Sequence, residues 1–219
     1  MRKWAPLAVL GLAQFLMVLD QAVMNVSITQ LVEDFDTSVN VIQGVITMYS
    51  LVMAMLMITG GKIGDILGRR RTFAIGMAIY GSGSALTAAS WSVGTLALGW
   101  SFLEGVGAAL VLPALVALIA GNYTGRDRIT AYAVIGGIAG AGIAVGPIVG
   151  GWATTELSWR VVFVGEVVLV LVTLAAIGFI TDVVAVRRPQ LDVVGSVLSA
   201  LGLGMIVFGF LQASVWGWL

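Results

Sequence analysis

The sequence of 219 residues contains no cysteine and no histidine, and only 10% of its residues are charged. Without cysteine there is no disulfide framework and no thiolate metal site, and without histidine the usual zinc, haem and Ser-His-Asp chemistries are excluded. No basic tract of the kind that binds nucleic acid is present either. We therefore expect no enzyme, no cofactor and no nucleic-acid partner.

Apolar residues, in contrast, make up 59% of the chain, and its mean hydropathy is +1.05. Soluble domains have roughly 25% charged residues, and a helix that crosses a bilayer needs about 20 mostly apolar residues. The sequence therefore predicts an all-α integral membrane protein with seven transmembrane helices. The predicted spans are Leu7–Ile28, Val39–Gly60, Phe73–Ser90, Val93–Ile119, Ile129–Ala153, Val161–Thr181 and Val193–Ala213.

The basic residues are distributed unevenly between the two sides of the predicted membrane protein. With the N-terminus inside, ten of the eleven basic residues fall in inner segments, and only Arg160 falls outside. The ten are Arg2, Lys3, Lys62, Arg69, Arg70, Arg71, Arg126, Arg128, Arg187 and Arg188. Cytoplasmic loops carry such an excess of lysine and arginine. We expect a multi-pass protein of the plasma membrane with a cytoplasmic N-terminus.

Three acidic residues, Asp20, Glu104 and Glu166, fall inside predicted spans. A carboxylate at mid-membrane costs about 2.5 to 3.5 kcal/mol, so such residues are candidates for function. No basic residue is predicted at their depth, so each acid must be protonated, hydrated, or bonded to neutral donors. Candidate donors are Asn25, Trp100 and Ser101. Proton handling would suit these acids, but each could instead only bond a neighbouring helix, and Glu166 could be an interfacial residue near Arg160.

Glycines recur every four residues in the fifth predicted span, at Gly142, Gly146 and Gly150, with Pro147 within the run. Such a strip lets another helix approach closely. Proline lacks an amide hydrogen and frees the carbonyl of Ile143, so we expect a bend beside the strip. Simple packing would explain most glycine strips of this kind, and the embedded proline makes this one more specific.

The loop after the second predicted span concentrates charge in the stretch "GGKIGDILGRRRTF", residues 60–73. Basic residues that anchor a loop in the cytoplasm would explain Arg69, Arg70 and Arg71. They would not explain an aspartate spaced by glycines, at Gly61, Gly64, Asp65 and Gly68. We expect Asp65 to accept hydrogen bonds at the start of the third helix and to pair with the arginines.

These motifs resemble those of the major facilitator superfamily, and within it the N-terminal half of the fourteen-span drug:proton antiporters. The family's loop pattern G-x-L-x-D-x-x-G-R-R-R is similar to "GKIGDILGRRR", and its first-helix signature L-D-x-T-I-V-N-V-A to "LDQAVMNVS", which retains Asp20 and Asn25. Its fifth-helix antiporter motif, G-x-x-x-G-P-x-x-G-G, is matched in full. The matching residues are Gly142, Gly146, Pro147, Gly150 and Gly151.

The fourth predicted helix departs from the family pattern R-x-x-Q-G-x-G-A-A, because this chain has "SFLEGVGAA". Ser101 stands where the family usually has an arginine, and Glu104 where it has a glutamine. That arginine is associated with proton coupling in the family. We therefore expect Glu104 to take a proton-handling or cation-binding role here.

The resemblance implies a six-helix bundle of two inverted three-helix repeats over residues 1–182, followed by a linker and a seventh span over residues 183–219. It also implies proton-driven efflux of drugs or other amphipathic small molecules, with the glycine-rich loop acting as a conformational latch. Helices two and five would be equivalent and inverted, so Glu156 and Arg160 would form an outer counterpart of that latch.

Transport by this fold needs an opposing half. We expect the chain to be the N-terminal part of a longer transporter, with the alternative that two copies dimerise. Another possibility is a transport-inactive membrane module that acts only by association with other membrane chains. The seventh predicted span ends near Trp216 and Trp218. Tryptophans of this kind are typical of the interface between membrane and water, here on the outer side of the plasma membrane.

Overall fold

The computed structural model describes residues 2–182 and 190–212, and these residues form helices joined by short connections. The α-helices are α1 (Ala5–Val26), α2 (Ile28–Asp34), α3 (Val39–Leu67), α4 (Arg69–Ala88), α5 (Val93–Leu96), α6 (Gly105–Asn122), α7 (Gly125–Glu156), α8 (Trp159–Ala175) and α9 (Val193–Gln212). A π-helix, η2 (Ala97–Glu104), joins α5 to α6, and η1 (Arg2–Trp4) and η3 (Ile177–Phe179) are 3₁₀ turns. The predicted all-α fold is confirmed. Arg187, Arg188, Trp216 and Trp218 lie outside the described residues.

Within the described residues each predicted span coincides with helical structure, and the span Val93–Ile119 covers α5, η2 and α6; Ala213 lies outside these residues. Six helices of the described chain are long and apolar enough to cross a membrane. The predicted span Phe73–Ser90 corresponds to α4, which has 20 residues but is less apolar, because it begins with three arginines and contains several serines, threonines and glycines. Helix α4 packs against α6, α8 and η2. A helix covered by neighbours exposes little surface to lipid, and polar residues on it can be satisfied within the bundle.

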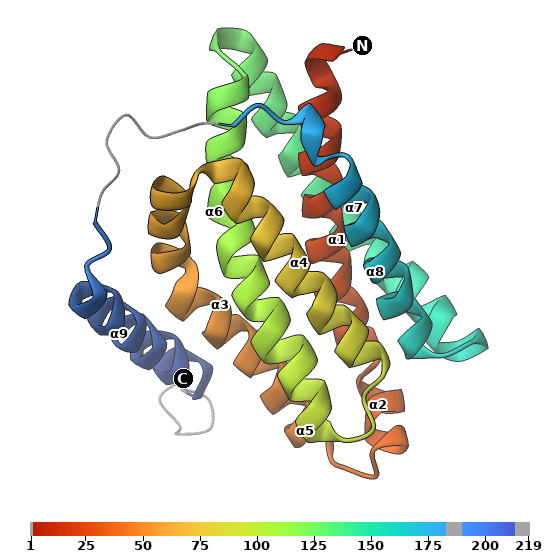
Figure 1. Ribbon diagram of the computed structural model, residues 1–219. Helices are drawn as coiled ribbons and strands as arrows, with labels where there is room; N and C mark the ends of the chain where they lie inside the picture. Colours follow the sequence, from red (N-terminus) through yellow and green to blue (C-terminus); the bar gives the residue numbers. More distant parts are fainter. Residues whose placement is uncertain (1, 183–189, 213–219) are drawn as a thin grey trace.

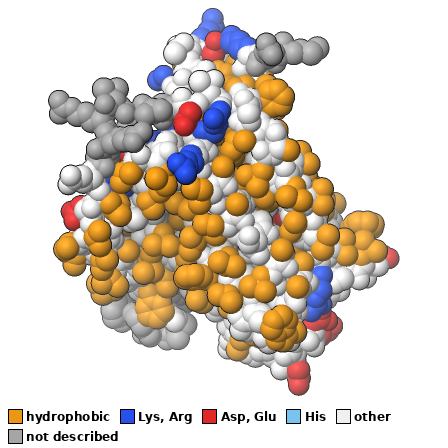
Figure 2. Space-filling view, in the orientation of Figure 1, with side chains coloured by type: hydrophobic (Ala, Val, Ile, Leu, Met, Phe, Trp, Pro, Cys, Tyr) orange, Lys and Arg blue, Asp and Glu red, His pale blue; other side chains and the backbone are white. Residues whose placement is uncertain are grey.

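The helices form a bundle in which α1 packs along α7, α4 lies against α6 and α8, and α3 lies between α6 and α9 (Figure 1). In their most apolar windows, 61% of the residues of α1 and of the α5–α6 rod are buried, against 17% for α3 and for α7. Many large apolar side chains are exposed on the outside of the bundle, and the face drawn in Figure 2 shows them between its two charged ends. Apolar residues on both the inside and the outside are typical of a helix bundle surrounded by lipid.

The glycine strip of α7 forms the contact with α1. A Cβ atom built on Gly146 would lie 2.3 Å from the Cβ of Ala22, so only glycine permits this approach. Gly142 and Gly150 are also buried against α1, whereas Gly151 is only half-buried. Pro147 lies on the exposed face, and α7 continues through it as one helix.

A second close approach joins α3 to α6. A Cβ atom on Gly60 would lie 2.2 Å from the backbone oxygen of Ala109. That carbonyl is four residues before Pro113, which lies inside α6 and has no amide hydrogen to donate to it. The bare backbone of α3 therefore packs directly on a carbonyl that has lost its helical partner.

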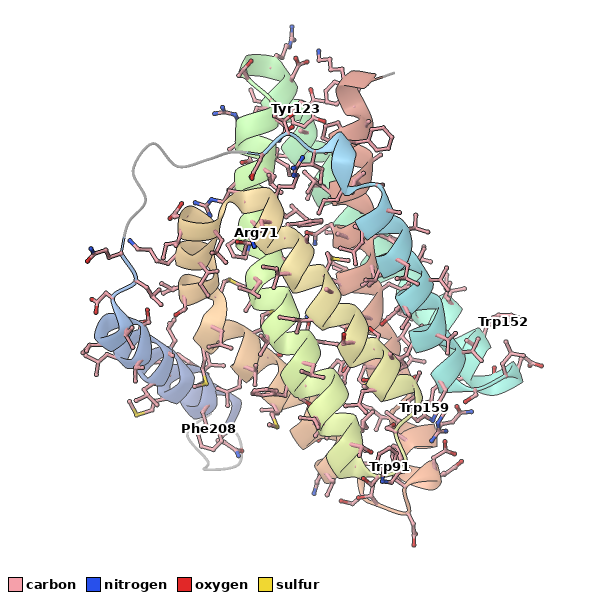
Figure 3. All side chains as sticks on the ribbon, viewed as in Figure 1. Arg71, Trp91, Tyr123, Trp152, Trp159 and Phe208 are labelled. Carbon is pink, nitrogen blue, oxygen red and sulfur yellow. The ribbon has the colours of Figure 1, made fainter. Side chains whose placement is uncertain are left out.

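The two ends of the bundle differ in charge and in aromatic residues. Lysine and arginine side chains gather at the end that holds the N-terminus, as Figure 2 shows. Arg71 and Tyr123 lie toward this end, and Trp91, Trp152 and Trp159 lie toward the other (Figure 3). At the N-terminal end, the ammonium of Lys3 is 2.8 Å from the carboxylate of Asp127.

At the opposite end, Arg160 pairs with Asp34, with 2.8 Å between Nη1 and Oδ2. It also donates a hydrogen bond of 3.0 Å to the carbonyl of Ser90. The indole N–H of Trp159 donates to the same carboxylate, and together with Arg160 it holds the pKa of Asp34 below its ordinary value. The expectation that Arg160 would act with Glu156 is therefore wrong, because α2 brings Asp34 to the guanidinium instead.

Candidate functional site

The three acids of the predicted spans converge in the interior of the bundle. Asp20 comes from α1, Glu104 from the end of η2 and Glu166 from α8, and one oxygen from each carboxyl group lies within 4.8 Å of the other two. Their exposed fractions are 0%, 0% and 1%. We call these three residues the carboxyl cluster. The sequence singled out each acid separately but did not predict that they meet.

The π-helix positions one side of the carboxyl cluster. Its i→i+5 hydrogen bonds widen the helix locally, a feature found frequently at functional sites. The ring of Trp100 stacks on that of Tyr49 at a centroid distance of 4.7 Å, and its indole N–H donates to Asp20 Oδ1 at 2.8 Å. Glu104 follows at the end of the same segment. The π-helix thus supplies both an acid and the donor that orients another acid.

Helix α4 supplies the remaining donors. The hydroxyl of Thr87 donates to Glu104 Oε1 at 3.3 Å, and the hydroxyl of Ser84 donates to Glu166 Oε2 at 3.2 Å. Gly83 makes room for this contact, because a Cβ atom there would lie 2.6 Å from Cγ of Glu104 and 2.7 Å from the backbone oxygen of Gly99. Two of the polar residues of α4, Ser84 and Thr87, therefore face the acids.

Each carboxyl group of the cluster has one oxygen without a hydrogen-bond partner: Asp20 Oδ2, Glu104 Oε2 and Glu166 Oε1. The ion pairs found within residues 2–182 and 190–212 join Lys3 to Asp127, Arg69 to Asp65 and Arg160 to Asp34, so none reaches the cluster. Several ionised carboxylates in a dry interior are very costly without a cation. The site must therefore hold protons or a cation, or admit water.

The predicted neutral donors are confirmed only in part. Trp100 does bind Asp20, but Asn25 donates to the carbonyl of Gln21 and is exposed. The hydroxyl of Ser101 donates to the carbonyl of Val45 at 2.8 Å and so fixes η2 to α3. The alternative of an interfacial Glu166 beside Arg160 is wrong, because Glu166 is buried.

Ser84 and Thr87 were missed by the sequence analysis. They lie three residues apart and so share one face of a helix, which is the pattern that could have revealed them. A serine and a threonine at this spacing are common in helices, so the pattern would have had little specificity on its own.

The glycine-rich loop forms a compact junction between α3 and α4. Gly68 has φ of 96°, in the left-handed region that favours glycine, and separates the two helices. Arg69 forms an ion pair with Asp65 and donates a hydrogen bond of 3.2 Å to the carbonyl of Gly61. Gly64 packs against the side chain of Arg69, which fits the absence of a side chain there.

The prediction that Asp65 pairs with an arginine at the start of the next helix is confirmed. Asp65 lies in the last turn of α3 and accepts a hydrogen bond from Arg69, the first residue of α4. The first turn of α4 is capped by Asp182, whose Oδ1 accepts from the amide of Arg70 at 2.9 Å. Arg70 also donates to the carbonyl of Ile180 at 3.1 Å. Asn122, the last residue of α6, donates to the carbonyl of Thr181 and accepts from its amide. The segment after α8 is thus tied to two other helices.

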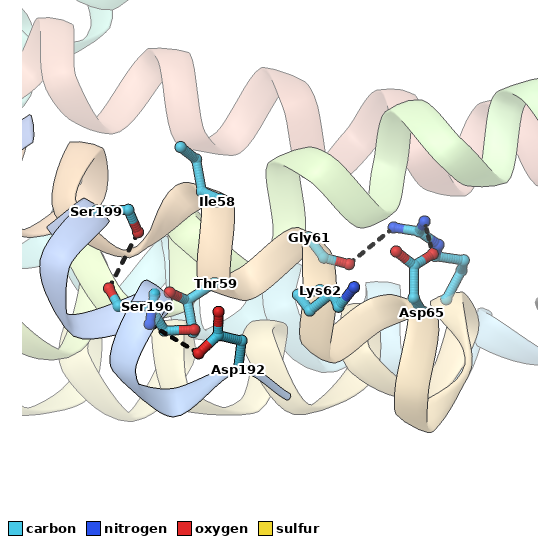
Figure 4. Close-up of a pocket in the computed structure, with 10 residues that line it drawn as sticks. Ile58, Thr59, Gly61, Lys62, Asp65, Asp192, Ser196 and Ser199 are labelled. Atoms are coloured by element: carbon cyan, nitrogen blue, oxygen red, sulfur yellow. Dashed lines mark hydrogen bonds and ion pairs between the residues drawn. The ribbon is translucent and has the colours of Figure 1, made fainter. Parts of the chain in front are cut away.

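A pocket of about 440 Å³ opens beside this junction, between α3 and the first turns of α9 (Figure 4). Charged and hydroxyl-bearing residues line it, including Lys62, Asp65, Asp192 and Ser196. Arg69 lines it too, and also a second pocket between α3, α6 and α7. Arg69 therefore borders two hollows, and its partner Asp65 borders the first of them.

Comparison with known proteins places this geometry in a family. Residues 10–194 match the Major Facilitator Superfamily. The chain is 38% identical over 219 residues to the puromycin resistance protein pur8 of Streptomyces alboniger, covering 99% of this chain and 43% of that protein. It is 32% identical over 222 residues to the probable actinorhodin transporter of Streptomyces coelicolor, covering 99% of this chain and 38% of the relative. The chain thus spans about two fifths of the length of these relatives.

Solved structures agree on the fold. A crystal structure of the peptide transporter POT in complex with sulfate has a TM-score of 0.73 to this chain at 18% identity, and the match covers 98% of this chain and 47% of that one. The crystal structure of the human organic anion transporter MFSD10 gives a TM-score of 0.66 at 16% identity, over 93% and 55% of the two chains. With its match over residues 10–194 and its several membrane-spanning helices, the chain is a multi-pass membrane protein that belongs to the major facilitator superfamily.

Proposed function

We propose that this chain is the N-terminal, proton-handling half of an exporter that moves amphipathic small molecules out across the plasma membrane. The observation that carries the proposal is the carboxyl cluster, in which three helices bring buried acids together with no ion-pair partner among the described residues. Intramembrane acids of this kind mark ion pathways and proton relays. The relatives named for antibiotic resistance and export favour efflux as the direction of transport.

Proton occupancy would be coupled to helix packing in this mechanism. A protonated cluster is compatible with the closed, dry arrangement of α1, η2 and α8, whereas an ionised one requires water. Release of protons therefore favours an arrangement in which these helices separate and admit water, and uptake favours closure. Because Ser101 takes the place of the family's usual arginine, the acids would perform this coupling without an internal cation from that position.

The substrate would be handled between α1, α6 and an opposing half. The opposing half is either the rest of a longer chain or a second copy of this one, because the relatives are more than twice as long as the part matched here. The excess of basic residues at the N-terminal end favours a cytoplasmic N-terminus. A transport-inactive module that only associates with other membrane chains is the alternative, and its prediction is that no assembly containing the chain moves substrate.

Efflux measured against a set proton gradient tests this function. The chain, together with its opposing half, is reconstituted in proteoliposomes loaded with a panel of amphipathic dyes. We expect dye movement when protons flow in the opposite direction and a return to the protein-free rate when a protonophore collapses the gradient. The proposal fails if the rate with an imposed gradient equals the rate without one for every dye.

We further propose that the α3–α4 junction is a latch that stabilises one access state through the Asp65–Arg69 pair. Asp65→Asn removes the charge that holds Arg69, and we expect about a tenfold fall in efflux, within the range of typical coupling energies between conformational states. Asp65→Glu, which keeps the charge, should retain more activity. Arg71→Gln is a matched control, because the Arg71 side chain is exposed.

The absence of cysteine offers a direct readout of this latch. A single Thr59→Cys replacement places one thiol in the pocket beside Asp65. We expect its labelling rate with a polar maleimide to rise when Asp65→Asn is added. An unchanged labelling rate together with unchanged efflux would contradict the latch.

A further inference from the structure

The carboxyl cluster offers a set of oxygens with the spacing that a metal ion requires. Calcium-type sites have metal–oxygen distances of about 2.3 to 2.6 Å, so two ligands on opposite sides of one ion lie about 4.6 to 5.2 Å apart. One oxygen from each of the three carboxyl groups lies within 4.8 Å of the others, so all three can contact a single ion. Mg²⁺ fits less well, because it binds at about 2.0 to 2.1 Å and usually keeps several waters.

A buried phenol group adds a second observation. Tyr80 is 0% exposed, and its hydroxyl makes no hydrogen bond of good geometry. This phenol lies beside Asp20, with whose carboxyl group its side chain interacts. Buried hydroxyls are nearly always hydrogen-bonded, so a hydroxyl beside these acids without a well-formed bond needs an explanation. A ligand that accepts oxygen lone pairs supplies one.

The neutral donors fix one oxygen of each carboxyl group and leave the other available to a ligand. Trp100, Ser84 and Thr87 each bind one oxygen of a carboxyl group, on Asp20, Glu166 and Glu104 respectively. The other oxygen of each group has no hydrogen-bond partner. Partners of this kind, which fix the orientation of ligating side chains, are the usual outer shell of a metal site.

The donor chemistry selects the class of ion. Every candidate ligand is an oxygen atom, and carboxylate and hydroxyl oxygens suit hard cations rather than the softer metals that prefer nitrogen or sulfur. A monovalent ion with two retained protons, or a divalent ion with one, would bring the three carboxyl groups to net neutrality. Either state avoids an uncompensated charge in the membrane interior.

We propose that Asp20, Glu104 and Glu166, with the Tyr80 hydroxyl, form a binding site for one hard metal cation of the Na⁺ or Ca²⁺ class. The site would exist whether or not the chain exports drugs, so the proposal goes beyond the proposed function. The ion and protons would compete for the same oxygens, since metal ligands must be deprotonated. The groups facing this competition are the three acids and the phenols of Tyr49 and Tyr80.

Equilibrium binding to the purified full chain in detergent micelles tests the proposal. The probes are ²²Na⁺ and, separately, ⁴⁵Ca²⁺, at several pH values and without a gradient or a transport substrate. We expect one of the two isotopes to bind at about one ion per chain, with affinity that rises with pH. Tyr80→Phe should weaken binding about tenfold, and Glu104→Gln should weaken it further.

Two matched controls remove the same chemical groups elsewhere. Asp127→Asn removes a carboxylate that pairs with Lys3 at the basic end, and Tyr123→Phe removes a buried hydroxyl that contacts Leu7 and Lys3. Both should leave ion binding unchanged. If acid variants of the cluster fail to fold, Tyr80→Phe still tests the site, because it removes one hydroxyl and keeps the aromatic ring and all three acids.

The proposal is overturned if neither isotope binds at saturating concentration, or if binding is the same in Tyr80→Phe and Glu104→Gln as in the original chain. Because binding is measured at equilibrium, this result would leave proton-driven export untouched. Conversely, failure of gradient-driven efflux would not affect the binding result. The isotope that binds decides between a monovalent and a divalent ion.

Discussion

Replacement of Glu104 by glutamine is expected to lower proton-driven efflux roughly 100-fold, the size of effect typical when a positioned proton-transfer group is removed. Glutamine is close to glutamate in size, and its carbonyl oxygen can still accept the hydrogen bond from Thr87. It cannot take up or release a proton. The measurement is the initial rate of dye efflux in proteoliposomes across a series of imposed pH gradients.

Two controls distinguish a loss of proton coupling at Glu104 from a general effect of removing a carboxylate or of unfolding. Asp127→Asn removes a carboxylate at the basic end and should leave both the rate and its pH dependence unchanged. Glu104→Gln should keep the melting temperature of the chain within a few degrees, since burying a neutral amide costs no more than burying a protonated acid with the same partner. If Glu104→Gln retained the original pH dependence, Glu104 would have no part in coupling.

The Gly60→Ala variant is expected to lose about 3 kcal/mol of stability, the upper part of the usual range for overpacking. The new methyl group would lie 2.2 Å from the carbonyl oxygen of Ala109, which belongs to the backbone of α6. A side chain could rotate away, but this oxygen can move only if α6 moves. Since α6 continues directly from η2, such a shift would also displace Glu104.

Gly61→Ala provides the matched control on the neighbouring residue of α3. A Cβ atom there would lie 3.6 Å from Pro113, an ordinary van der Waals distance. Both substitutions gain roughly 1 kcal/mol of helix propensity, so the difference between them isolates the clash. Melting curves of the two variants in detergent, followed by tryptophan fluorescence, measure this difference. Equal melting temperatures would show that α3 and α6 are not in the described contact.

Much of the fold could be predicted from the sequence because long apolar runs leave a chain few alternatives to membrane-spanning helices. The packing face of α7 could also be predicted. Gly142, Gly146 and Gly150 are spaced by nearly one helical turn, so they lie on one side of the helix. The sequence could not reveal that α4 would be covered by its neighbours. Nor could it reveal that two hydroxyl-bearing residues of this helix, Ser84 and Thr87, face the acids.

The candidate site was predicted only as separate residues. An acid in an apolar run is conspicuous, so Asp20, Glu104 and Glu166 could be found one by one. Their convergence depends on the face that each helix presents, and a π-helical segment changes that face in a way that α-helical periodicity does not describe. Short-range pairs such as Asp65–Arg69 were accessible because four residues span one turn.

Contacts across long sequence separations were not accessible. Asp182, which caps α4 through the amide of Arg70, is 112 residues away from it, and no local pattern signals such a pair. Asp34 reaches Arg160 across 126 residues, and the nearer acid, Glu156, was chosen wrongly for that reason. A prediction from spacing favours local partners even where tertiary packing supplies better ones.

The segment from Ile180 to Asp182 is a point of mechanical connection. It is bonded to the first turn of α4 through Arg70 and to the last turn of α6 through Asn122. A pull on the chain beyond Asp182 therefore loads these two helices, which flank the carboxyl cluster, as well as α8. A force on the chain after Asp182 would therefore reach the basic end of the bundle through the hydrogen bonds of Ile180, Thr181 and Asp182.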